Sequence, residues 1–131
     1  MMRLATMALC TAPAIAACGP TSEELRQMPA LFTTNVPDYW DKVATCLIDS
    51  YSTGGFLTPD NKPVPAEKRT ELYLQIRGSL GQEFNVALYD IRGTGSSSAV
   101  TFHRRKTLMN SEATINDARE RVERCKPPAR Q

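Results

Sequence analysis

A charge-free stretch at the N-terminus sets the strongest limit on how much of this chain can fold. Behind the single basic residue Arg3, residues 4–17 carry no charge and end in small side chains. A basic start, a short apolar core and small residues at its end are typical of a secretory signal. A helix needs about 20 apolar residues to cross a bilayer, so this stretch is too short for a membrane span. We therefore expect residues 1–17 to be a signal peptide that lies outside the folded domain.

The end of that stretch resembles the lipobox of bacterial lipoproteins. The segment Ile15-Ala16-Ala17-Cys18 matches the usual order of Leu, then Ala or Ser, then Gly or Ala, then Cys, with Ile15 in place of the commoner Leu. The resemblance implies cleavage after Ala17 and acyl chains, such as palmitate, on Cys18. It also implies a Gram-negative cell envelope, and Gly19 favours the periplasmic face of the outer membrane. The resemblance covers only the start of the chain. It implies where the protein is located in the cell and does not imply an activity.

Two other interpretations of this segment stay open. Ala14-Ile15-Ala16 also fits an ordinary signal peptidase site, and cleavage there would release a soluble protein. The segment could instead be a buried helix, although Pro13 argues against that.

The cysteines are consistent with export and lipidation. The chain has Cys10, Cys18, Cys46 and Cys125. If Cys10 leaves with the signal and Cys18 carries lipid, Cys46 and Cys125 remain as an even pair in an oxidising compartment, which predicts a disulfide. A disulfide between Cys46 and Cys125 would close a loop of 79 residues. Closing a loop of that length stabilises the folded chain by about 4.5 kcal/mol at most. A catalytic thiol or a zinc ligand is the alternative, but the sequence has no C-x-x-C motif and its lone histidine is His103.

Proline and glycine divide the remaining chain into a tether and one domain. We expect residues 18–36 to be a flexible tether and residues 37–131 to be a single domain. Helical spacing of apolar residues predicts one helix from Asp38 to Tyr51 and another from Ser111 to Cys125. Phe56–Ala66 is predicted to be a loop because it contains three prolines. Alternating patterns predict strands over Glu71–Arg77, Glu83–Ile91 and Ser98–Arg104.

These elements predict an α+β fold in the order helix, three-stranded antiparallel meander, helix. Each strand alternates apolar with polar or mixed residues, so we expect one buried sheet face and one open face. Both helices must cover the buried face, with the disulfide between Cys46 and Cys125 joining them.

The open face and its loops supply the candidate partner-binding residues. The face is expected to present Tyr73, Asn85, Tyr89 and Thr101, and the hairpin tip Gly93–Ser98 presents Gly95. The tip lacks the lysine of a phosphate-binding loop, so it is interpreted as a turn. A dense basic run, His103, Arg104, Arg105 and Lys106, is either a solvated strand end or a contact for lipid phosphates or an acidic protein.

No motif indicates catalysis, a metal or another cofactor. The single histidine excludes a multi-histidine metal site, and the net charge of +2 does not suit a nucleic-acid-binding protein. His103 near Asp90 and Ser96–Ser98 lacks a hydrolase motif, and Glu71, Glu83 and Asp90 lack a recognisable glycosidase arrangement.

We therefore expect a non-enzymatic, lipid-anchored envelope protein. Its expected partners are the membrane, through the Cys18 lipid, and another envelope or secreted protein, which it would inhibit or neutralise. The alternative is a structural or accessory subunit of an outer-membrane or secretion assembly.

Overall fold

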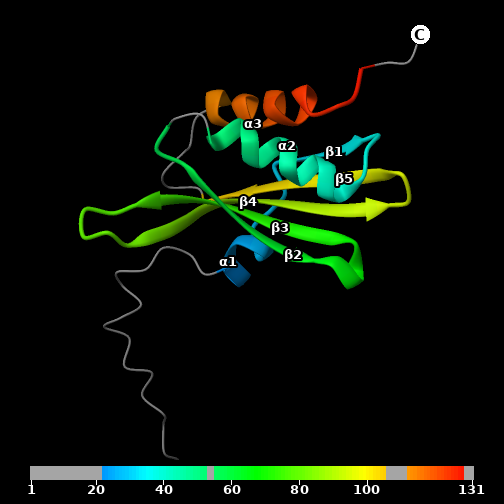
Figure 1. Ribbon diagram of the computed structural model, residues 1–131. Helices are drawn as coiled ribbons and strands as arrows, with labels where there is room; N and C mark the ends of the chain where they lie inside the picture. The colour runs from blue at the N-terminus through cyan, green and yellow to red at the C-terminus, as the bar shows by residue number, and fades with distance from the viewer. Residues whose placement is uncertain (1–21, 53–54, 106–111, 129–131) are drawn as a thin grey trace, which may run out of the picture.

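The computed structural model describes residues 22–52, 55–105 and 112–128, which form a β-sheet with α-helices packed on it (Figure 1). The signal segment and Cys18 lie outside those residues. Along the chain the elements are α1 (Ser22–Gln27), β1 (Phe32–Val36), α2 (Trp40–Ser52), β2 (Thr58–Val64), the short 3-10 helix η1 (Pro65–Glu67), β3 (Arg69–Arg77), β4 (Glu83–Thr94), β5 (Ser97–Arg104) and α3 (Glu112–Arg124).

The sheet has five antiparallel strands in the order β1-β5-β4-β3-β2. The prediction of a three-stranded meander is therefore wrong. Its strands form β3, β4 and β5, but β1 and β2 add one strand on each side. As a result β5, which ends with His103 and Arg104 of the basic run, is an interior strand and not an edge.

The strand β1 comes from the segment that was predicted to be a tether. Phe32 pairs with Phe102 and Val36 with Ser98, so β1 lies along β5 over its whole length. The rings of Phe32 and Phe102 stack with centroids 5.3 Å apart, and Val36 is fully buried. From Ser22 onward the predicted tether therefore belongs to the folded domain.

The strand β2 comes from the segment that was predicted to be a loop. Its prolines, Pro59 and Pro63, are four residues apart and point the same way across the strand. Only one partner, β3, pairs with β2, so both positions that lack an N–H group can lie on the unpaired edge. Proline there also discourages a further strand from pairing with this edge.

Helices cover both faces of the sheet, not one. In Figure 1, α2 and α3 lie above the sheet and α1 lies below it. The main core between the sheet and the two upper helices includes Leu47, Tyr89, Phe102 and Val122. A smaller core on the other face joins Leu25 of α1 to Tyr73 and Leu88.

The disulfide between Cys46 and Cys125 is present, which confirms that prediction. It joins α2 to the residue that follows α3, across 79 residues of sequence, with the two Cα atoms 5.8 Å apart. Both helices lie on the same sheet face, as expected, and begin and end within two residues of the predicted bounds.

Candidate functional site

A hollow of about 510 Å³ lies where three separate segments meet. They are the start of α2, the turn of the β4–β5 hairpin and the chain after α3. Its walls are formed by Pro37, Asp38, Tyr39, Lys42, Ser96, Ser97, Pro127 and Pro128. We call this set the proline hollow. The predicted binding residue Gly95 is not among these residues, but it precedes Ser96 in the same hairpin turn.

The hairpin is fixed to the start of α2 by Gly93. A Cβ atom at this position would lie 2.9 Å from the Lys68 carbonyl oxygen and 2.9 Å from Cδ1 of Trp40, closer than real Cβ atoms approach. The N–H of Gly93 donates to the same Lys68 oxygen at 2.7 Å. Glycine therefore allows Trp40 to lie against the backbone of the hairpin, which is the close approach that glycine permits.

A side-chain hydrogen bond fixes the hairpin a second time. The hydroxyl of Ser98 donates to the carbonyl oxygen of Asp38 at 2.7 Å, and the Asp38 N–H donates to the Val36 carbonyl at 2.8 Å. Asp38 is thus held between β1 and β5 immediately before α2 begins. Two walls of the proline hollow are therefore parts of one rigid unit.

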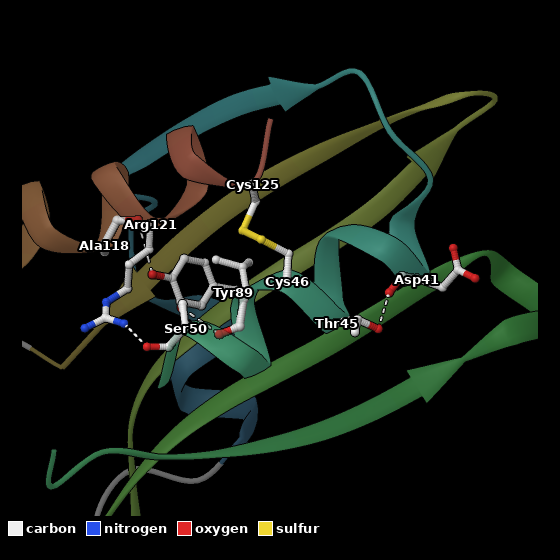
Figure 2. Close-up of a disulfide and its surroundings, with 9 residues drawn as sticks. Asp41, Thr45, Cys46, Ser50, Tyr89, Ala118, Arg121 and Cys125 are labelled. Carbon is white, nitrogen blue, oxygen red and sulfur yellow. Dashed lines mark hydrogen bonds between the residues drawn. A yellow bond between two sulfur atoms is a disulfide. The ribbon is translucent and has the colours of Figure 1, made fainter. Parts of the chain in front are cut away.

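The disulfide holds the third wall. Figure 2 shows the bridge reaching from Cys46 on α2 to Cys125 at the end of α3. Pro127 and Pro128 follow Cys125 after a single residue, Lys126, whose Nζ forms an ion pair with Glu123 at 2.8 Å. The position of the two prolines is therefore set by the bridge.

Arg121 fastens α3 to α2 one helical turn before the bridge (Figure 2). Its Nη1 donates to the carbonyl oxygen of Ser50, and its guanidinium lies 4.1 Å from the centroid of the Tyr51 ring. An ion pair with Asp117 at 2.8 Å orients the same side chain. These contacts of Arg121 with α2 depend on tertiary structure, so the sequence alone does not show them.

Tyr39 and Lys42 give the proline hollow its chemical character. The Tyr39 side chain is half exposed, and Nζ of Lys42 lies 5.6 Å from its ring centroid. A tyrosine offers a large contact area with only two side-chain torsions to fix, and prolines have little freedom left to lose. A rigid surface that presents an aromatic ring beside prolines suits binding of a protein segment.

Tyr73 and Tyr89 do not lie on an open face, because both are fully buried. Tyr73 lies beneath α1 and donates to Glu71 at 3.0 Å. The Tyr89 hydroxyl is 2.7 Å from that of Tyr51 and donates to the Ala118 carbonyl at 3.3 Å. Neither tyrosine can contact a partner at the surface, so their prediction as binding residues is corrected.

The other two side chains of that predicted face have partners within the sheet. The carboxamide oxygen of Asn85 accepts a hydrogen bond from Gln75 at 2.9 Å. The hydroxyl of Thr101 lies 3.3 Å from that of Thr33 on β1.

The basic run is not one exposed patch. His103 and Arg104 are buried, and the His103 Nδ1 donates to the Met28 carbonyl oxygen at 2.8 Å. Arg105 is half-buried and its backbone N–H donates to Val86. Lys106 lies outside the described residues. The described residues of this run therefore do not form one exposed cationic surface for a partner.

A second hollow, of about 340 Å³, lies at the opposite ends of the same helices. Tyr51, Phe56, Leu57, Asp117 and Arg121 contribute to its walls, and Phe56 is largely exposed at its rim. Its charged groups are already engaged, because Arg121 contacts α2 and Asp117 pairs with Arg121. Residues 53–54 and 106–111, which adjoin it in sequence, lie outside the described residues, so we do not assign it a ligand.

The carboxylates considered for glycoside hydrolysis are each engaged by a guanidinium. Arg26 and Arg69 contact Glu71, Arg92 contacts Asp90, and Arg77 contacts Glu83. Within residues 22–52, 55–105 and 112–128, no group of three or more His, Cys, Asp or Glu side chains is placed to hold a metal ion. No helix in those same ranges is long and apolar enough to span a membrane.

Comparisons with protein families, with characterised proteins and with solved structures find no match to this chain. The functional argument therefore depends on the residues and their geometry.

Proposed function

We propose that this protein is a small lipid-anchored envelope protein that binds another protein through the proline hollow, without catalysing a reaction. The partner is an envelope or secreted protein that it inhibits or neutralises. The anchor is the acylated Cys18, on the periplasmic face of the outer membrane of a Gram-negative cell.

One observation carries the proposal: the walls of the proline hollow come from three distant segments and are locked together. Trp40 lies against Gly93, Ser98 bonds Asp38, and the disulfide positions Pro127 and Pro128. A site that is rigid before binding loses little conformational entropy when a partner docks. The half-exposed Tyr39 at its edge is the type of side chain that anchors protein interfaces.

The disulfide also supports the proposed location in the cell envelope. Disulfides persist in oxidising compartments such as the bacterial periplasm. The pairing of Cys46 with Cys125 agrees with a signal that removes Cys10 and a lipid that occupies Cys18.

The experiment is affinity capture from solubilised envelope extracts with the purified protein and two variants. The first variant, Tyr39→Ala/Lys42→Ala, removes the aromatic and cationic groups of the proline hollow. The matched control, Phe56→Ala/Lys62→Ala, removes an exposed ring and an exposed cation elsewhere. We expect a specific protein to be captured by the wild type and the control, and its recovery to fall at least about tenfold with the first variant, as for loss of an interface anchor.

Equal capture by both variants would contradict binding at the proline hollow, and capture of nothing specific would contradict the binding role. The size of the captured species separates inhibition from assembly. A complex with one partner supports an inhibitor, whereas a large stable complex in native membranes supports the alternative role as an assembly subunit. Recovery of a Cys18→Ala variant in the membrane fraction would refute the lipid anchor.

A further inference from the structure

The two edges of the sheet differ in how well they are protected against pairing with another strand. The edge strand β2 contains Pro59, Pro63 and Lys62, and these residue types discourage a further strand. The other edge strand, β1, has neither a proline nor a charged residue over Phe32–Val36. Its neighbour in the sheet is β5 on one side, so a row of its backbone groups faces away from the sheet. Such a row is a template for another strand.

A hydrogen bond of β5 identifies which backbone groups of β1 face outward. The carbonyl oxygen of Phe102 accepts from the Leu31 N–H at 2.8 Å, so the backbone of Phe102 is directed at β1. Phe102 lies opposite Phe32, and bonded positions in an antiparallel pair are every second residue. The even-numbered residues of β1 therefore face β5. The N–H and C=O groups of Thr33 and Asn35 face outward, and among the described residues no strand pairs with them.

The side chains of β1 hold this edge in place without covering it. The rings of Phe32 and Phe102 stack with centroids 5.3 Å apart, and Val36 is fully buried in the main core. On the opposite face of the strand, Thr33 and Asn35 are exposed. The outward groups are therefore fixed in position before binding, which lowers the entropy that a partner strand must lose.

The outward groups of β1 are complementary to those of a second β1. When two copies run antiparallel with Thr34 at the centre, Thr33 of each copy lies opposite Asn35 of the other. Residues of a hydrogen-bonded antiparallel pair exchange both N–H···O bonds, so every outward N–H and C=O group is then paired.

The side chains fit the same register. Opposing residues share a face of the sheet, so Phe32 of each copy meets Val36 of the other on the main-core face. The polar residues Thr33 and Asn35 meet on the exposed face. Because β1 has no charged side chain, the two-fold axis brings no like charges together within the strands.

We propose that the outward edge of β1 is a dimerisation surface, to which a second copy of this chain adds its own β1 in antiparallel orientation. The two sheets then form one continuous sheet with a two-fold axis at Thr34, the commonest symmetry of homodimers. Pro37 and Asp38 follow β1 directly, so the proline hollows of the two copies lie at opposite ends of the paired strands. This inference goes beyond the proposed function and depends neither on the lipid anchor nor on the partner of the proline hollow.

Cysteine cross-linking tests the register. The full chain is purified with its disulfide intact in a Cys10→Ala/Cys18→Ala background, so that an introduced cysteine is the one free thiol. Across the axis the Cα atoms of the two Thr34 residues lie about 4.5 Å apart, within the range of a disulfide, whereas those of the two Thr33 residues lie roughly 9 Å apart.

We expect mild oxidation to convert Thr34→Cys to a covalent dimer with a several-fold higher yield than Thr33→Cys. Thr33 is the more exposed of the two positions, so random collision would give the opposite order. Equal yields, or a higher yield for Thr33→Cys, would overturn the proposed pairing.

Proline substitution tests whether the outward backbone groups make the contact. Thr33→Pro removes an N–H group that faces away from β5, and proline is tolerated at such a position of an edge strand. The matched control Thr33→Val keeps that N–H group and removes the hydroxyl. In the same Cys10→Ala/Cys18→Ala background, we expect sedimentation equilibrium at high protein concentration to show dimers for the parent chain and Thr33→Val, and monomers for Thr33→Pro.

A parent chain that stays monomeric at the highest soluble concentration would overturn the dimer. If Thr33→Pro fails to fold, the yields of Thr34→Cys and Thr33→Cys still decide. Hydrogen exchange of the Thr33 and Asn35 amides identifies the other possible occupant. If these amides are protected only after addition of the protein captured through the proline hollow, the edge pairs with a strand of that partner, which overturns pairing with a second copy and leaves the proposed function standing.

Discussion

At the scale of single residues, Gly93 lies where the surrounding atoms leave no room for a side chain. The Gly93→Ala variant places a methyl group 2.9 Å from backbone and from the Trp40 ring, and the Lys68 carbonyl cannot move without breaking its hydrogen bond to this residue. We expect the free energy of unfolding to fall by about 1–3 kcal/mol, which is typical of overpacking. Urea unfolding followed by Trp40 fluorescence measures it.

The matched control for that prediction is Gly95→Asn at the hairpin turn. Gly95 has φ of +82° and open space around it, and asparagine tolerates a positive φ better than most residues. This variant should lose less stability than Gly93→Ala. If Gly93→Ala is as stable as the wild type, the hairpin is not held by its contact with Trp40.

The Tyr51 hydroxyl predicts how stability depends on alkaline pH. Burial raises the pKa of Tyr51 from its ordinary 10.0 to about 12, although the hydrogen bond to Tyr89 opposes the rise. Between these values the unfolded chain releases the tyrosine proton while the folded chain keeps it. The unfolded state then binds fewer protons, so the free energy of unfolding decreases as pH rises from about 10 to 12.

The Tyr51→Phe variant tests this cause. It loses the hydroxyl pair with Tyr89, which costs about 1 kcal/mol near neutral pH. Its stability should decline less steeply above pH 10, by up to about 1.4 kcal/mol per pH unit. Urea unfolding at several pH values measures the slope, with Tyr39→Phe, which removes an exposed hydroxyl, as the control. An unchanged slope in Tyr51→Phe would contradict the assignment.

At the scale of elements, the sequence predicted strands and helices whose pattern is long and regular. The central strands and both long helices follow from alternation, helical spacing and proline boundaries. The edge strands did not, because β1 is only Phe32–Val36 between two prolines, and β2 contains Pro59 and Pro63. An edge strand needs hydrogen bonds on one side only, so its composition resembles that of a loop.

A β-bulge explains why Tyr89 was assigned to the wrong face. The register between β3 and β4 shifts at Leu74/Gln75, and as a result the neighbours Val86 and Ala87 both lie in the main core. Beyond that point alternation is reversed, which puts Tyr89 in the main core and Leu88 under α1. A strict period of two in the sequence carries no sign of this extra residue.

The candidate site could be predicted only in part for a related reason. Gly95 and its hairpin were recognisable from turn residues, but the rest of the proline hollow was not. Tyr39 lies within the predicted helix Asp38–Tyr51, and Pro127 and Pro128 lie beyond the predicted end of the last helix at Cys125, so nothing in the sequence brought them together. Their meeting depends on the order of strands and on the disulfide, neither of which local pattern determines.

At the scale of the whole molecule, the two layers of helices have different tasks. The six-residue α1 buries one leucine against one face of the sheet, whereas α2 and α3 cover the main core on the other face and carry the proline hollow. Because β1 joins α1 directly to the sheet, the chain has no long flexible part between Ser22 and the domain. From Ser22 onward, the flexible tether that the sequence predicted is therefore replaced by structured elements.

The disulfide connects this arrangement to global stability. It closes a loop of 79 residues, so chain entropy gives a contribution of at most about 4.5 kcal/mol. The free energy of unfolding of a domain is roughly 5–15 kcal/mol in total. Loss of the bridge therefore removes a large part of the stability of the folded state. We expect Cys46→Ala/Cys125→Ala to unfold at markedly lower urea concentration than the wild type.

Reduced wild type is the control for that variant, because both lack the bridge but differ in side chains. The two should unfold alike, and oxidised wild type should exceed both by several kcal/mol, within the entropy figure given above. A difference below about 1 kcal/mol would mean that Arg121 and Tyr51 hold α3 to α2 almost unaided. In that case Pro127 and Pro128 would keep their places without the bridge, and capture of the partner should then be insensitive to reduction.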